Sequence, residues 1–81
     1  MTATIQLLDN HNRILDRFNI KIENVFHVDD FTHEDELSLR GRINDALVKM
    51  VTDPKAQLAI LNYVAYDIFL DNRRYDHIMV A

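Results

Sequence analysis

The chain has 81 residues, no cysteine, and 13 acidic against 9 basic residues, which gives a formal net charge of -4. The composition excludes disulfides, and the negative balance disfavours non-specific binding to nucleic acid or to anionic membranes. No apolar run reaches the ~20 residues that a membrane span requires, so we expect one small cytoplasmic domain over residues 1–81.

The first 28 residues show the alternation of apolar and polar residues that is typical of β-strands. It begins in TATIQL and is interrupted by DNHN, which is turn chemistry because Asn and Asp tolerate left-handed backbone. It resumes over residues 14–28, with Ile14 expected on the same apolar face as Phe18, but this run is too long for one ordinary strand. We therefore predict an antiparallel β-hairpin, a break near residues 23–24, and an optional third short strand over residues 25–28.

Residues 33–52 change to a helical period, with apolar residues at three- and four-residue steps. The apolar stripe comprises Leu39, Ile43, Ala46, Leu47 and Met50. Thr32 is expected to cap the start of this helix, with Asp35 at the third helical position of a capping box. Gly41 lies in the helix interior, where glycine costs ~1 kcal/mol relative to alanine.

The segment TDPK favours a second helix start, with Asp53 as the N-cap and Pro54 at the first helical position. Residues 56–72 are predicted as a helix that is apolar on nearly every side and is capped by Asn72. YDHIMV then reads as a C-terminal strand that joins the sheet of the hairpin. The fold class is therefore α+β, a single compact domain in the order ββ(β)ααβ.

The stretch VFHVDDFTHEDELSLR is the densest cluster of titratable side chains. It contains His27, Asp29, Asp30, His33, Glu34, Asp35 and Glu36. Helix capping accounts for Glu34 and Asp35, because acids in a first turn favour the positive end of the helix dipole.

Two further interpretations of this stretch stay open. No Lys or Arg occurs between Val25 and Leu39. The five acids, Asp29, Asp30, Glu34, Asp35 and Glu36, therefore predict a recognition patch for a cationic partner. Alternatively, His27, Asp29 and His33 supply the imidazole and carboxylate ligands of a metal-binding module.

The predicted helix over residues 56–72 has more apolar surface than a small sheet and one other helix can cover. Tyr63 and Tyr66 are three residues apart and would share one face with Ile60 and Val64. Tyrosine is enriched at interfaces, so these four residues predict a homodimer or partner interface.

Arg13, Arg17 and Lys21 form a basic stripe, because alternate residues of a strand share one face. Such a row can contact a phosphate backbone, and it is equally typical of a solvent-facing edge strand. Since the protein is acidic overall, direct nucleic-acid binding is not expected.

No catalytic constellation is visible. The one serine, Ser38, has no evident base, and a single glycine excludes a glycine-rich phosphate loop. We therefore expect no enzyme activity and no cofactor. The expected function is that of a small non-catalytic protein-binding domain, an inhibitor, adaptor or accessory subunit of the type common in bacteria and their phages.

Overall fold

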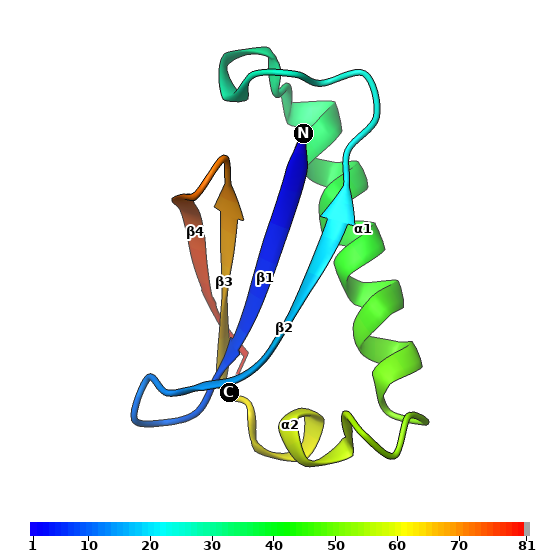
Figure 1. Ribbon diagram of the computed structural model, residues 1–81, viewed down its shortest axis with the longest axis vertical. Coiled ribbons are helices and arrows are strands. Elements are labelled where there is room, and N and C mark those ends of the chain that lie inside the picture. The colour runs from blue at the N-terminus through cyan, green and yellow to red at the C-terminus, as the bar shows by residue number, and fades with distance from the viewer. Residues whose placement is uncertain (81) are drawn as a thin grey trace.

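The computed structural model describes residues 1–80 and confirms an α+β fold, in which a four-stranded antiparallel sheet is combined with two helices. In chain order the elements are β1 (Thr2–Leu8), β2 (Ile14–Lys21), a one-turn 3₁₀ helix (Val28–Asp30), α1 (His33–Met50), α2 (Gln57–Asn62), β3 (Ala65–Leu70) and β4 (Arg73–Met79). The strand order is β2-β1-β3-β4, so β1 and β3 are central (Figure 1). No helix within residues 1–80 is long and apolar enough to cross a membrane.

The β1–β2 hairpin is confirmed, and its turn uses the predicted chemistry. One carboxylate oxygen of Asp9 accepts hydrogen bonds from the backbone N–H groups of His11 (2.8 Å) and Arg13 (2.9 Å). Asn12 adopts the left-handed backbone that asparagine tolerates, with φ 60°. The expected position of Ile14 is wrong, because the strand register shifts between Leu7 and Leu8 and leaves Ile14 half exposed.

The optional strand over residues 25–28 is not formed. β2 ends at Lys21, and Asn24 takes a left-handed backbone (φ 63°) at the predicted break. The chain then leaves the sheet, buries Val25, and makes the 3₁₀ turn at Val28–Asp30. The β-branched and aromatic residues of this segment favour a strand locally, but no neighbouring strand is available to pair with them.

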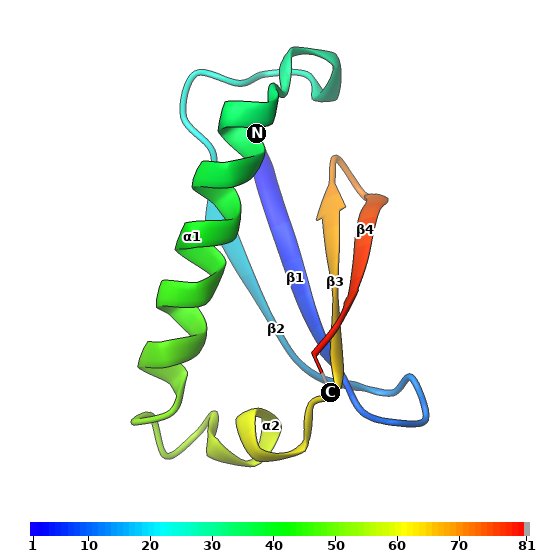
Figure 2. The same cartoon turned by 180° about the vertical axis from the view of Figure 1, so that it is seen from behind.

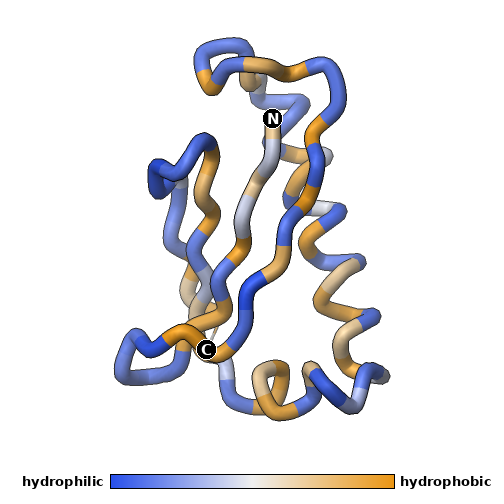
Figure 3. The backbone as a smooth tube through the Cα atoms, in the orientation of Figure 1, coloured by the Kyte–Doolittle hydropathy of each residue, from blue (hydrophilic) through white to orange (hydrophobic). Residues whose placement is uncertain are grey.

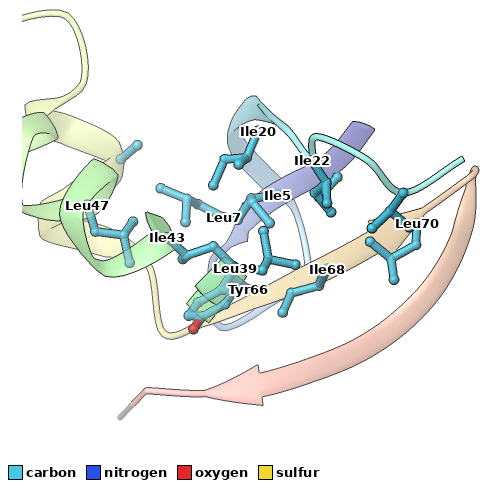
Figure 4. Packing of buried hydrophobic residues seen from close by; sticks show 13 residues of the cluster. Ile5, Leu7, Ile20, Ile22, Leu39, Ile43, Leu47, Tyr66, Ile68 and Leu70 are labelled. Carbon is cyan, nitrogen blue, oxygen red and sulfur yellow. The ribbon is translucent and has the colours of Figure 1, made fainter. Parts of the chain in front are cut away.

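The first helix is confirmed with its cap, although it ends at Met50 rather than at residue 52. It lies across one face of the sheet (Figures 1 and 2), and its buried residues are Leu39, Ile43 and Leu47. These side chains pack with apolar residues of the sheet, as Figure 4 shows, and the cluster includes Ile5, Leu7, Ile20, Ile68 and Leu70. The core therefore lies between α1 and a single face of the sheet.

The prediction of one helix over residues 56–72 is wrong. Asp53 organises a turn by accepting from the backbone N–H of Lys55 (3.0 Å), and the short helix α2 begins only at Gln57. β3 follows, and Asp71 and Asn72 (φ 50° and 64°) form a two-residue hairpin turn into β4 rather than a helix end. β3 is a central strand with five of its six residues buried, so it reads as a continuous apolar run that periodicity cannot distinguish from a buried helix.

Candidate functional site

The predicted acidic stretch lies at one end of the molecule, where the chain passes from β2 to α1 (Figure 1). Asp29 and Asp30 belong to the 3₁₀ turn, and Glu34, Asp35 and Glu36 form the first turn of α1. The five carboxylates therefore come from two elements, and their surroundings differ.

Asp35 is used by the helix itself. Its backbone N–H donates to the Thr32 hydroxyl (3.2 Å), while its carboxylate accepts from the Thr32 backbone N–H (2.9 Å). This reciprocal pair is the predicted capping box, which satisfies two N–H groups that have no partner inside the helix. The prediction for Thr32 and Asp35 is confirmed.

Glu36 is also used structurally, in a network that connects α1 to β4. The Tyr75 hydroxyl donates to Glu36, and Arg40 lies 3.5 Å from the same carboxylate and 2.7 Å from that of Asp76. The hydrogen bond from Tyr75 lowers the pKa of Glu36, and the hydrogen bond from Arg40 lowers the pKa of Asp76. We call Glu36, Arg40, Tyr75 and Asp76 the clamp.

Three of the five acids remain: Asp29, Asp30 and Glu34. Each is exposed, and within residues 1–80 none of their carboxylates makes a hydrogen bond or ion pair. Phe26 lies just before them in the same connection and is 78% exposed. We call Phe26, Asp29, Asp30 and Glu34 the acidic end. Phe26 was not predicted as an exposed residue, because VFHV resembles a strand, in which alternate residues are buried.

The metal interpretation required His27, Asp29 and His33 to converge. Among residues 1–80, no three His, Cys, Asp or Glu side chains come together so as to hold a metal ion. His33 instead lies 3.6 Å from Glu36 within the first turn of α1. The geometry therefore offers no support for the metal-binding alternative.

The four residues expected to share a helix face lie in different elements. Ile60 is in α2, Tyr63 and Val64 follow it, and Tyr66 is in β3 with its side chain turned into the core (Figure 4). Burial raises the pKa of Tyr66. Exposed apolar side chains do occur where the chain passes from the end of α1 into α2, and Figure 3 shows hydrophobic colouring on both helices. They are Val48, Val51, Leu58 and Leu61.

The basic stripe is divided by the structure. Arg13 pairs with Asp9 at 2.9 Å in the turn between β1 and β2. Arg17 and Lys21 alternate with the core residues Phe18 and Ile20 and therefore point to the face of the sheet opposite α1.

We call the face opposite α1 the open face. Its central residues are Thr4 and Gln6 of β1, Arg17 and Asn19 of β2, Asp67 and Phe69 of β3, and Arg74 and His77 of β4. Two shallow hollows lie on it, with volumes of about 470 and 370 Å³, and Gln6 lines both of them. Phe69, Arg74 and His77 were not predicted for this face, because residues 65–70 resemble a helix in the sequence and the pairing of β3 with β4 is not visible there.

Comparison with protein-family models, with curated proteins and with solved structures found no match.

Proposed function

We propose that this chain is a small non-catalytic protein-binding domain, an inhibitor, adaptor or accessory subunit, that presents its acidic end to a cationic surface of another protein. The observation that carries the proposal is that the connection from β2 into the first turn of α1 exposes the ring of Phe26 together with three carboxylates that have no partner within residues 1–80. Aromatic side chains are enriched among the residues that dominate interface energetics, and unpaired acids steer a cationic partner during association.

The connection that carries the acidic end is held in place by its neighbours. Val25 is buried in the core, and the backbone N–H of Ile22 donates to the carbonyl of Met1 at 2.8 Å. Phe31 packs edge-to-face on Tyr75, with ring centroids 5.5 Å apart. Because the flanking backbone is anchored, binding of a partner to Phe26 costs less conformational entropy than binding to a residue in a free loop.

The assignment of acids to this surface differs from the five residues considered in the sequence. Asp35 and Glu36 contribute negative charge, but the capping box and the clamp already use their carboxylates. Asp29, Asp30 and Glu34 are therefore the residues whose neutralisation tests recognition at a small cost in stability, namely the helix-dipole contribution of Glu34, which is about 0.3–1 kcal/mol.

We also propose a cytoplasmic location, which the absence of cysteine supports. A bacterial or phage origin is proposed because small acidic domains of this type are common there. We further propose homodimerisation near α2. Ile60, Tyr63 and Val64 are partly exposed there and could contact a second copy. Tyr66 is only 7% exposed and belongs to the core, so it would not contact the second copy directly.

The test compares two variants with a matched control. One variant is Phe26→Ser, the other combines Asp29→Asn, Asp30→Asn and Glu34→Gln, and the control is Asp45→Asn on α1. Partners are captured from a host lysate by immobilised protein, and association with the purified partner is then followed by surface plasmon resonance at several salt concentrations.

We expect the acid variant to slow association and flatten its salt dependence, because steering by charge acts on the association rate. Phe26→Ser should mainly speed dissociation, and Asp45→Asn should behave as the parent protein. If both variants capture and bind the same partner with parental kinetics, the acidic end is not the recognition surface.

A further inference from the structure

The open face brings together cations that are far apart in the sequence. Arg17 lies on one edge strand, β2, and Arg74 lies on the other, β4. Three strand spacings, or about 14 Å, separate the two strands. Figure 1 shows the two central strands between them.

The register places an aromatic ring and amide side chains between these cations. Asn19, Thr4, Phe69 and Arg74 are successive partners across the four strands, and the next row contains Arg17, Gln6, Asp67 and His77. Phe69 is partly exposed, unlike every other residue of β3. The face therefore interleaves basic, aromatic and amide groups, although no contiguous stretch of sequence does so.

The local charge of the open face is opposite to that of the whole protein. Within residues 1–80, the guanidinium groups of Arg17 and Arg74 make no ion pair. The carboxylate among the central residues belongs to Asp67, which is buried and contacts His77. Lys21 follows Arg17 and Asn19 on the same face of β2 and lies 4.0 Å from the exposed Glu23.

The two hollows of the open face are lined by these same basic, aromatic and amide side chains. Phe69, Arg17 and Asn19 line the smaller one, and Arg74 and His77 line the larger one. Because Gln6 lines both, the two hollows adjoin each other at β1, and together their lining residues extend from β2 to β4. A planar ring beside unpaired arginines and amide groups suits a ligand that has both aromatic rings and phosphates.

We propose that the open face binds single-stranded nucleic acid, with Phe69 stacking on a base and with Arg17 and Arg74 contacting phosphates on either side of it. Base–aromatic stacking in a cationic groove is the usual mode of binding for single strands. The net charge of -4 opposes such binding at long range, but salt screens it beyond about 10 Å, whereas direct contacts within the hollows persist.

A second copy of this chain is a competing occupant, because its acidic end would also complement Arg17 and Arg74. The observations favour a single strand. The acidic end supplies no stacking partner other than Phe26 and gives no role to the amide groups of Gln6 and Asn19, which suit base edges.

The test uses fluorescence anisotropy with a labelled mixed-sequence single strand of about 12 nucleotides, as DNA and as RNA, at roughly 50 mM salt and upward. We expect saturable binding by the full chain. Arg17→Gln and Arg74→Gln should each weaken it and reduce the slope of log affinity against log salt by about 0.7. Phe69→Leu should weaken it about 5- to 150-fold.

Asp29→Asn serves as the matched control, because it changes one charge on the acidic end and leaves the open face untouched. It should bind the strand at least as well as the parent chain. Amide chemical shifts of the parent chain, recorded during titration with the same strand, give a readout that needs no substitution. The largest changes should occur at the open-face residues of all four strands, including Arg17 and Asn19 of β2.

Several outcomes overturn the proposal. Absence of binding at roughly 50 mM salt does so, as does binding that the three open-face variants leave unchanged. If dextran sulfate competes as well as an unlabelled strand, and Phe69→Leu binds as well as the parent chain, the open face binds polyanions in general and not single-stranded nucleic acid. Self-association that Arg17→Gln abolishes, without strand binding, assigns the face to a second copy of this chain.

Discussion

The two faces of the sheet are built by the same four strands and have opposite properties. On the face under α1, Ile5, Leu7 and Ile68 are fully buried, whereas on the open face Arg17, Asn19 and Arg74 are exposed. Antiparallel sheets commonly bury one face and leave the other in water. Here this division separates the residues that stabilise the domain from residues that are free to bind a ligand.

The largest expected difference between the faces is in stability. Ile68→Ala leaves a cavity beneath α1 and should lower the free energy of unfolding by about 2–5 kcal/mol. Gln6→Ala, on the open face of the neighbouring strand, should change it by less than about 0.5 kcal/mol. Urea unfolding followed by circular dichroism measures both. Equal effects of the two substitutions would show that the open face is also covered in solution.

A smaller effect is expected from the clamp, which holds the start of α1 against β4. Arg40→Met removes the contact with Asp76 (2.7 Å) and the ion pair with Glu36. Because the Arg40 side chain is about one-third exposed, solvent screens these contacts, and we expect a loss of about 1–2 kcal/mol in the free energy of unfolding. Lys49→Met, at an exposed position of α1 whose ammonium makes no hydrogen bond or ion pair within residues 1–80, is the matched control.

The clamp also predicts a pH dependence. Glu36 and Asp76 have folded-state pKa values below their ordinary values of 4.5 and 3.8, so the unfolded chain binds more protons in acid. The stability from these groups is complete above about pH 5 and is lost as the pH falls through the folded pKa values. Thermal melts between about pH 3 and pH 7 should therefore show a flatter acid limb for Arg40→Met. An unchanged acid limb would contradict the role of the clamp.

The smallest expected effect is a gain in stability. Gly41 lies in the interior of α1 on its exposed side, and a Cβ added there meets nothing within 4 Å. Gly41→Ala should raise the free energy of unfolding by about 0.5–1 kcal/mol, because alanine restricts the unfolded chain and has the higher helix propensity. The same urea experiment measures it. A loss of stability would show that the outer side of α1 is covered by another molecule in solution.

Local sequence rules were sufficient where a segment carries its own signal. The capping box of Thr32 and Asp35, the buried stripe of Leu39, Ile43 and Leu47, and the turn at Asp9 were all predicted correctly. Each depends on residues within a few positions of one another, so the chain sequence alone contains the necessary information.

The same rules failed where pairing partners are distant in the chain. Residues 65–70 were predicted as helix because five of the six residues of this central strand are buried, so no alternation of apolar and polar residues marks it as a strand. Residues 25–28 were predicted as an optional strand, but β2 is an edge strand and the chain turns away from it at Asn24. The candidate sites changed accordingly, since Glu36 proved to be part of the clamp and Phe69 and Arg74 came to lie on the open face.

Residue patterns along the chain are sufficient to identify a small cysteine-free α+β domain whose first helix starts with a capping box and a run of acids. Which of these acids lack a partner depends on long-range contacts, because Asp76 and Tyr75 reach Arg40 and Glu36 from the far end of the chain. Long-range pairing likewise places two arginines without ion pairs, Arg17 and Arg74, on one face of an acidic protein. Strand pairing across long intervals of sequence brings Arg17 and Arg74 to one face, and composition carries no information about such pairing.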